Sequence, residues 1–294
     1  MVANVKYYVV TIVSIFLAIG LGIFIGFMLN AQDILSSQRE DIVSQLEVKF
    51  DYLKDENEKI KSESQKTNNE NKKLNEFNRI VYQGMINDRL SGLRVGVIES
   101  NDDYLYSEVN QTLDLAGARV VSNTTVKDSL FADLDKLKET YKTIMDKEAP
   151  EIISAVTNEL TRSLISGEIS PLIKELSDQG LIDISQASSE GLDYIVIGGG
   201  SKDKDDNRYK TVDKTIIDTA KKNNIPVVGI EKEDVKNSYI EKYKESRISS
   251  VDNVNSDIGK MTLILVMDGH PGNYGVKSSA ESLAPALNNP SKEQ

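Results

Sequence analysis

One uncharged apolar segment near the N-terminus constrains this chain more than any other feature of its sequence. Residues Tyr7 to Leu29 read YYVVTIVSIFLAIGLGIFIGFML, and no second segment of this kind follows. A bilayer core of about 30 Å needs roughly 20 apolar residues in a helix, so this segment is long enough to cross it. The sequence therefore predicts a membrane anchor in residues 1–30 that tethers everything after it.

A cleaved signal peptide is the alternative for this segment. Its apolar region would be roughly 7 to 15 residues long, end at small residues and follow a basic leader. Here the run is longer, the leader holds only Lys6, and LNAQD is a poor cleavage site. The flanking charges, Lys6 against Arg39 and Lys49, give only a thin orientation bias. The short leader favours a single-pass protein with a cytoplasmic N-terminus and an extracytoplasmic C-terminal domain.

Composition excludes several classes of function. The chain has 46 acidic and 35 basic residues, and its net charge of −11 repels nucleic acid phosphates. It has no Cys, no Trp and one His, so disulfides, thiolate metal sites and cysteine nucleophiles are excluded, and the usual zinc sites and Ser-His-Asp triads lack their materials. We expect no nucleic acid partner, no cofactor and no enzymatic activity.

Residues 31–92 carry a heptad pattern. The stretch is polar, lacks Pro and has its first Gly at position 84. Apolar residues recur at d positions, whereas the a positions are apolar near the ends and polar in the middle, a pattern that predicts a coiled-coil stalk. The predicted dimer seam is Val43, Leu46, Phe50, Leu53, Asn57, Ile60, Asn71, Leu74, Asn78 and Val81.

Asn at a positions is tolerated in a parallel two-stranded coil, so we expect a parallel homodimer. A solvated single helix or a disordered linker from Asn57 to Asn71 is the alternative for the weak middle of the seam. In the anchor, Gly22 and Gly26 form a GxxxG pair, which allows two membrane helices to approach closely. Glycine is also common in membrane helices without such a role, and a dimeric stalk makes the packing role more plausible.

Residues 93–270 predict an α/β domain. Short apolar strands at RVGVIES, RVVSNTTV, GLDYIVIGGG and IPVVGIEK alternate with helical segments, which indicates a mainly parallel sheet of Rossmann-like or flavodoxin-like topology. Residues 127–186 are interpreted as a helical insertion. The domain is expected to end with a strand near ISSVDNV and a helix from Ser256 to Met267, followed by a turn-rich, partly extended tail over residues 271–294.

Candidate ligand sites in this domain are weak. Neither GxGxxG nor GxxxxGK[ST] is present, and the cluster Gly198 to Gly200 is better explained as a strand end that needs room than as a phosphate loop. The acidic run Asp203, Asp205 and Asp206 lacks the remaining residues of a calcium loop.

Several segments together resemble the copper transport protein family of the MctB type. They are the N-terminal anchor, the coiled coil, LSGLRVGVIES, LAGARVVSNTTV, SSVDNVNSDIGKMTLILVMDG and GNYGVKSSAESLAP, in this order. The resemblance covers nearly the whole chain. It implies a role in copper export or homeostasis, with the mycobacterial members assigned to the outer membrane. It also implies, as an alternative, the role of SteB-like envelope proteins, which act with a SteA partner in cell division and envelope assembly.

The sequence contains few side chains that are typical copper ligands. Copper(I) prefers Cys and Met sulfur, and copper(II) takes imidazole readily. The six Met residues have packing explanations, and Met267 with His270 is the one soft pair within a helical turn, a weak metal candidate. Two hypotheses follow: a copper homeostasis protein without its own copper site, or a dimeric envelope scaffold that acts with a SteA-like partner.

Overall fold

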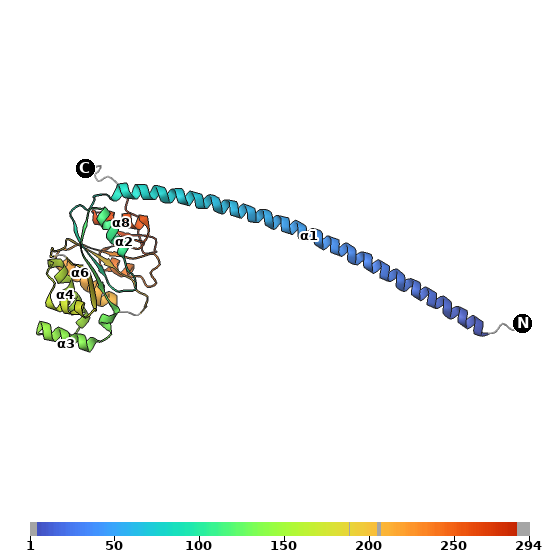
Figure 1. The fold of residues 1–294 in the computed structure, drawn as a ribbon, viewed down its shortest axis with the longest axis horizontal. Helices are drawn as coiled ribbons and strands as arrows, with labels where there is room; N and C mark the ends of the chain where they lie inside the picture. Colours follow the sequence, from blue (N-terminus) through green and yellow to red (C-terminus); the bar gives the residue numbers. More distant parts are fainter. Residues whose placement is uncertain (1–4, 188, 205–206, 287–294) are drawn as a thin grey trace. The chain divides into compact units, whose positions relative to one another are not determined.

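The computed structural model describes residues 5–187, 189–204 and 207–286. Asp205 and Asp206 of the acidic run lie outside this part. The chain divides into two compact units, Met1–Leu74 and Asn75–Gln294. Helix α1, Val5–Ile86, runs through the first unit and ends in the second (Figure 1).

The predicted N-terminal apolar helix is confirmed. Within α1, Lys6–Leu29 is the one stretch of the described residues that is long and apolar enough to cross a membrane. The following residues stay helical through the weak middle from Asn57 to Asn71, so that part is not a disordered linker. In the single chain the apolar seam residues are exposed, for example Leu53 at 61% and Ile60 at 60%. The dimer itself stays a prediction.

The last turns of α1 belong to the α/β unit. Ile86 is fully buried and Tyr82 nearly so, and the Tyr82 hydroxyl donates a hydrogen bond to Thr112 Oγ1 at 3.2 Å. Asn78 and Val81, at the end of the predicted seam, are half-buried in this unit. The end of the predicted stalk is therefore part of the domain core.

The described part of the second unit contains a seven-stranded sheet in the order β3-β2-β1-β4-β5-β6-β7. All neighbouring strands are parallel except β3, which pairs antiparallel with β2. Without β3, the parallel strands follow the flavodoxin-like order, so the predicted mainly parallel α/β sheet is confirmed. The strands are β1 Arg94–Glu99, β2 Arg119–Val126, β3 Ile182–Ala187, β4 Tyr194–Gly198, β5 Val227–Ile230, β6 Ser249–Val251 and β7 Asn273–Tyr274.

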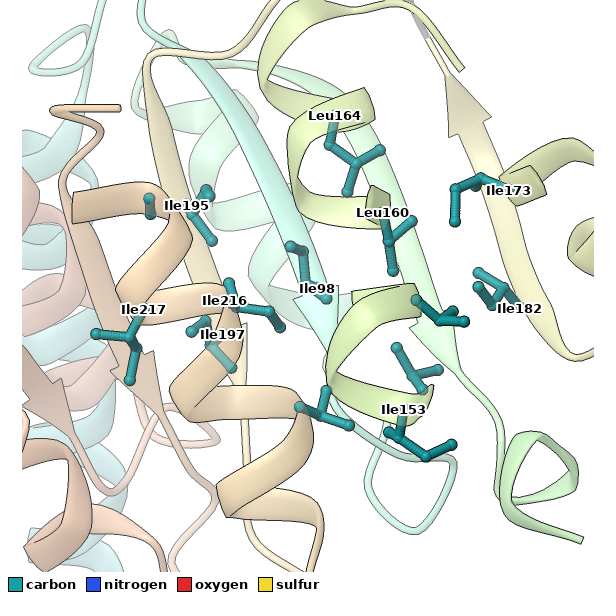
Figure 2. Close-up of a cluster of buried hydrophobic side chains, with 14 of the residues drawn as sticks. Ile98, Ile153, Leu160, Leu164, Ile173, Ile182, Ile195, Ile197, Ile216 and Ile217 are labelled. Carbon is teal, nitrogen blue, oxygen red and sulfur yellow. The ribbon is translucent and has the colours of Figure 1, made fainter. Parts of the chain in front are cut away.

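Helices cover both faces of this sheet, as its strand sequence requires. Successive residues of β4 alternate between two apolar clusters, with Ile195 and Ile197 on one face and Tyr194 and Val196 on the other. The first face packs against α4 and α6 (Figure 2), and the second against the end of α1, α2 and α8. The helices are α2 Ser107–Leu115, α3 Leu134–Met145, α4 Ile152–Ser166, α5 Pro171–Asp178, α6 Lys214–Lys222, α7 Ile240–Glu245 and α8 Asp257–Met267.

Residues 127–186 correspond to the predicted helical insertion only in part. A 3-10 turn at Asp128–Phe131 and helices α3 to α5 occupy residues 128–178, but residues 182–187 form β3. The alternating pattern of IDISQA fits an edge strand, since Ile182 is buried and Asp183 is exposed. Helix α4 also packs against α6 in the main core, so it is an integral layer of the domain.

Candidate functional site at the carboxyl edge of the sheet

The carboxyl ends of the parallel strands carry a set of buried acidic side chains. Ligands of flavodoxin-like sheets bind outside these ends, at the point where the strand order reverses, which here lies between β1 and β4. Glu99 follows β1's apolar residues, Glu231 follows β5, and Asp252 follows β6. All three are at most 4% exposed.

The sequence analysis missed these residues, although a signal was present. The segments VGVIE, VVGIE and SSVD each place an acidic residue at the end of a short strand, which is apolar in the first two. Because the carboxyl ends of parallel strands lie at one edge of a sheet, these three side chains are expected to lie at that edge.

The glycine cluster after β4 is packed against aromatic rings. A Cβ atom at Gly198 would collide with the ring of Tyr106, and one at Gly199 with Tyr243. The Tyr106 hydroxyl also donates a hydrogen bond to the Gly199 carbonyl oxygen at 2.7 Å. The chain's own tyrosines therefore occupy the place where a phosphate loop would need open backbone, which agrees with the interpretation that this strand end needs room.

Asp213 is in contact with the hydroxyl group of Tyr243. It ends a π-helical turn, Tyr209–Asp213, that leads into α6; such turns occur frequently at functional sites. Its Oδ1 accepts a hydrogen bond from the Tyr243 hydroxyl at 2.6 Å. Complete burial raises the pKa of Asp213 to about 7, although the hydrogen bond from Tyr243 opposes this change.

Glu231 is held by the C-terminal tail. The ammonium group of Lys277 forms an ion pair with Glu231 Oε2, and the Ser238 hydroxyl donates to the same oxygen at 2.6 Å. Burial raises the pKa of Glu231, and Lys277 opposes this rise. The pair contributes to fixing the tail, since removal of Lys277 would leave a fully buried carboxylate without its cation.

Asp252 fixes the same part of the tail. Its two carboxylate oxygens accept hydrogen bonds from the backbone N–H groups of Val276, at 2.7 Å, and Lys277, at 3.0 Å. Gly275 has a φ of +140°, and a Cβ there would collide with the Asp252 carboxylate. The turn-rich tail is thus joined to the sheet through β7 and these contacts.

Glu99 and Arg208 complete the edge with contacts inside the chain. Glu99 accepts hydrogen bonds from the Tyr106 N–H at 2.6 Å and the Thr125 hydroxyl at 2.7 Å. Arg208 donates to the Ser100 carbonyl oxygen at 3.3 Å and forms an ion pair with Asp128. Most of the polar groups named at this edge therefore form hydrogen bonds or ion pairs within the chain.

The predicted soft pair lies at the opposite end of the domain. Met267 is 9% exposed and packs in the apolar cluster beneath α8, and His270 Nδ1 lies 3.2 Å from the Leu265 carbonyl oxygen. In the described residues, no group of three or more His, Cys, Asp or Glu side chains is placed to hold a metal ion. In the anchor, the surfaces above Gly22 and Gly26 are open in the single chain.

The family model of MctB, the copper transport outer membrane protein, matches residues 2–285. The chain belongs to the MctB family. The resemblance found in the sequence is thereby confirmed over nearly the whole chain. A comparison with curated proteins gives no match. Two segments that carried the resemblance meet in the structure, because Asp252 of SSVDNV binds the backbone of VK in GNYGVKSS.

Substitution of Gly229 tests the packing at this edge. A Cβ atom at Gly229 would collide with the Tyr243 ring, whereas one at Gly84 on α1 would meet nothing within 4 Å. We expect Gly229→Ala to lower the free energy of unfolding by roughly 1–3 kcal/mol. The control Gly84→Ala should raise it by roughly 0.5–1 kcal/mol. Thermal unfolding followed by circular dichroism measures both, and a Gly229→Ala variant as stable as the parent would contradict this packing.

The raised pKa of Asp213 predicts a pH dependence of stability. Its folded pKa of about 7 lies above the ordinary 3.8, so the stability linked to this proton is fully present below about pH 4 and is lost as the pH rises through 7. Asp213→Asn keeps an oxygen for the Tyr243 hydroxyl and removes the titration. Its unfolding temperature should exceed that of the parent at pH 8, with a smaller difference at pH 5.

The matched control for this pH test is Asp218→Asn, since Asp218 is exposed on α6. Its unfolding temperature should follow the parent at both pH values. A difference between Asp213→Asn and the parent that does not change with pH would contradict the assignment.

Proposed function

We propose that this chain is a membrane-anchored, non-enzymatic component of copper transport or copper homeostasis that has no copper site of its own. Family membership supports the copper role and the membrane location. The observation that supports the absence of a copper site is the burial of the methionine side chains. Met145, Met261 and Met267 are at least half-buried and pack in the two apolar clusters of the second unit, which supports a role for their sulfur atoms as core filler.

The filled carboxyl edge supports the non-enzymatic half of the proposal. Tyr106 and Tyr243 lie across the glycines at the strand ends, where substrates of such sheets bind. Catalysis needs polar groups free to contact a substrate. Here Glu99, Glu231 and Asp252 accept hydrogen bonds from the chain itself.

A deletion strain tests the copper role. It should be hypersensitive to copper or accumulate it, and the Met267→Leu, His270→Gln double variant should restore tolerance as well as the parent chain does. The purified full-length protein should show no saturable copper binding in a titration. A strain with normal copper tolerance contradicts the copper role, and a double variant that folds but fails to restore tolerance contradicts the absence of a site.

A dimeric envelope scaffold that acts with a SteA-like partner is the second candidate function. The exposed seam favours it, because Val43, Leu46 and Phe50 are each more than half exposed in the single chain. Apolar d positions on a polar helix are ordinarily covered by a second helix. A parallel dimer anchored by Gly22 and Gly26, with a cytoplasmic N-terminus, would present two α/β domains outside the cytoplasm. A deletion that alters septation while copper tolerance stays normal would favour this function.

Cross-linking tests the seam directly, because the chain contains no Cys. Leu53→Cys introduces one thiol at a predicted d position, and Asp55→Cys introduces one at the outward f position. In membranes treated with a mild oxidant, Leu53→Cys should yield a disulfide-linked dimer on non-reducing gels, since facing d residues lie within bridging distance. Asp55→Cys should remain mostly monomeric. Equal cross-linking of the two variants, or none at Leu53→Cys, would contradict the parallel seam.

A further inference from the structure

An open groove lies at the amino edge of the sheet, at the opposite end of the strands from the buried acidic residues. It is formed where β4, β5 and β6 begin and where α6 and α8 end. Its volume is about 700 Å³, within the range of roughly 300–1,000 Å³ that is typical of small-molecule sites.

The floor of the groove is apolar and includes one unpartnered polar group. Pro226, Val227, Ile248 and Met267 contribute to its lining. Tyr194 also lines it and is 8% exposed, yet its hydroxyl makes no hydrogen bond to any described residue. Burial, with no compensating partner, raises the pKa of Tyr194 to about 12. The hydroxyl is therefore a free donor on the apolar floor of the groove.

The rim of the groove carries positive charge that the domain does not neutralise. Arg247 and Lys221 both line it, and neither forms an ion pair with another described residue. Lys221 Nζ donates instead to the Ser246 carbonyl oxygen. The one acidic lining residue, Asp193, is neutralised by Arg94 through two side-chain contacts of 2.6 and 2.8 Å. In a chain of net charge −11, this is a locally cationic site.

Arg247 is also held in an unusual backbone conformation. It follows α7 with a φ of +54°, in the left-handed region where glycine or asparagine is the ordinary residue at a helix end. A large side chain there costs energy. Its position at the rim places a guanidinium, which recognises carboxylates in a planar two-point geometry, beside an apolar floor.

We propose that this groove binds a small amphipathic anion, with an apolar body on the floor around Val227 and Ile248 and a carboxylate at Arg247, Lys221 and the Tyr194 hydroxyl. Charge complementarity selects an anion, and the apolar floor selects a ligand with a hydrocarbon or aromatic body. The volume matches a small molecule rather than a folded partner.

The test uses three probes with the full-length protein in detergent micelles and empty micelles as the blank. The probe 3-phenylpropionate has both an apolar body and a carboxylate, 3-phenylpropan-1-ol has the body alone, and acetate has the charge alone. Isothermal titration calorimetry should show saturable binding of 3-phenylpropionate, weaker binding of the alcohol and none of acetate. Equal binding of the acid and the alcohol, or no binding of the acid, overturns the proposal.

Variants locate the binding in this groove. Arg247→Asn removes the cation and suits the left-handed backbone, so the protein should unfold at the same or a higher temperature. It should weaken 3-phenylpropionate binding about tenfold, the loss of one charge-assisted contact, and leave the alcohol unaffected. Tyr194→Phe should weaken the acid by a smaller factor, and the control Lys222→Gln, on the exposed end of α6, should not. Parent-like binding of the acid by Arg247→Asn would overturn the assignment.

Discussion

The packing of Tyr243 across the sheet is the interaction on which the carboxyl edge depends. Gly199 and Gly229 leave room for its ring, and its hydroxyl binds Asp213 at 2.6 Å. Once the ring fills this place, the carboxylates near it lose contact with water and need partners from the chain. Glu231 obtains its cation from Lys277, which brings the C-terminal tail onto the edge. One aromatic contact thus links the centre of the sheet to the last described segment.

Much of this fold was predictable from the sequence, because its central strands are short apolar runs between polar turns. The strands β1, β2, β4 and β5 lie where the apolar pattern placed them. The missed elements are short or depend on distant partners: β7 has two residues and exists through its pairing with β6, and β3 follows three helices as an antiparallel edge strand. Local sequence carries little of that information. At the carboxyl edge, the sequence indicated only that acidic residues end the strands. It could not indicate the ion pair of Glu231 with Lys277, because these residues are 46 positions apart.

Helix α1 presents different faces for burial in the two units. Up to Leu74 its apolar d residues face solvent in the single chain, so their burial requires a second helix. Beyond that residue the helix is part of the α/β unit, and Tyr82 and Ile86, which lie outside the a and d positions, are the buried residues. The change of buried face explains why the seam alone placed the end of the stalk too close to the first strand.

The two edges of the sheet differ in a way that bears on function. At the carboxyl edge, Glu231 is paired with Lys277 and Arg208 with Asp128, while Glu99 and Asp252 accept hydrogen bonds from the chain itself. At the amino edge the cations Arg247 and Lys221 have no acidic partner among the described residues, although the chain has 11 more acidic than basic residues. Both cations are exposed and so accessible to a ligand, and the left-handed backbone at Arg247 costs energy. Ligand recognition in this domain is therefore better sought at the edge that flavodoxin-like sheets ordinarily leave unused.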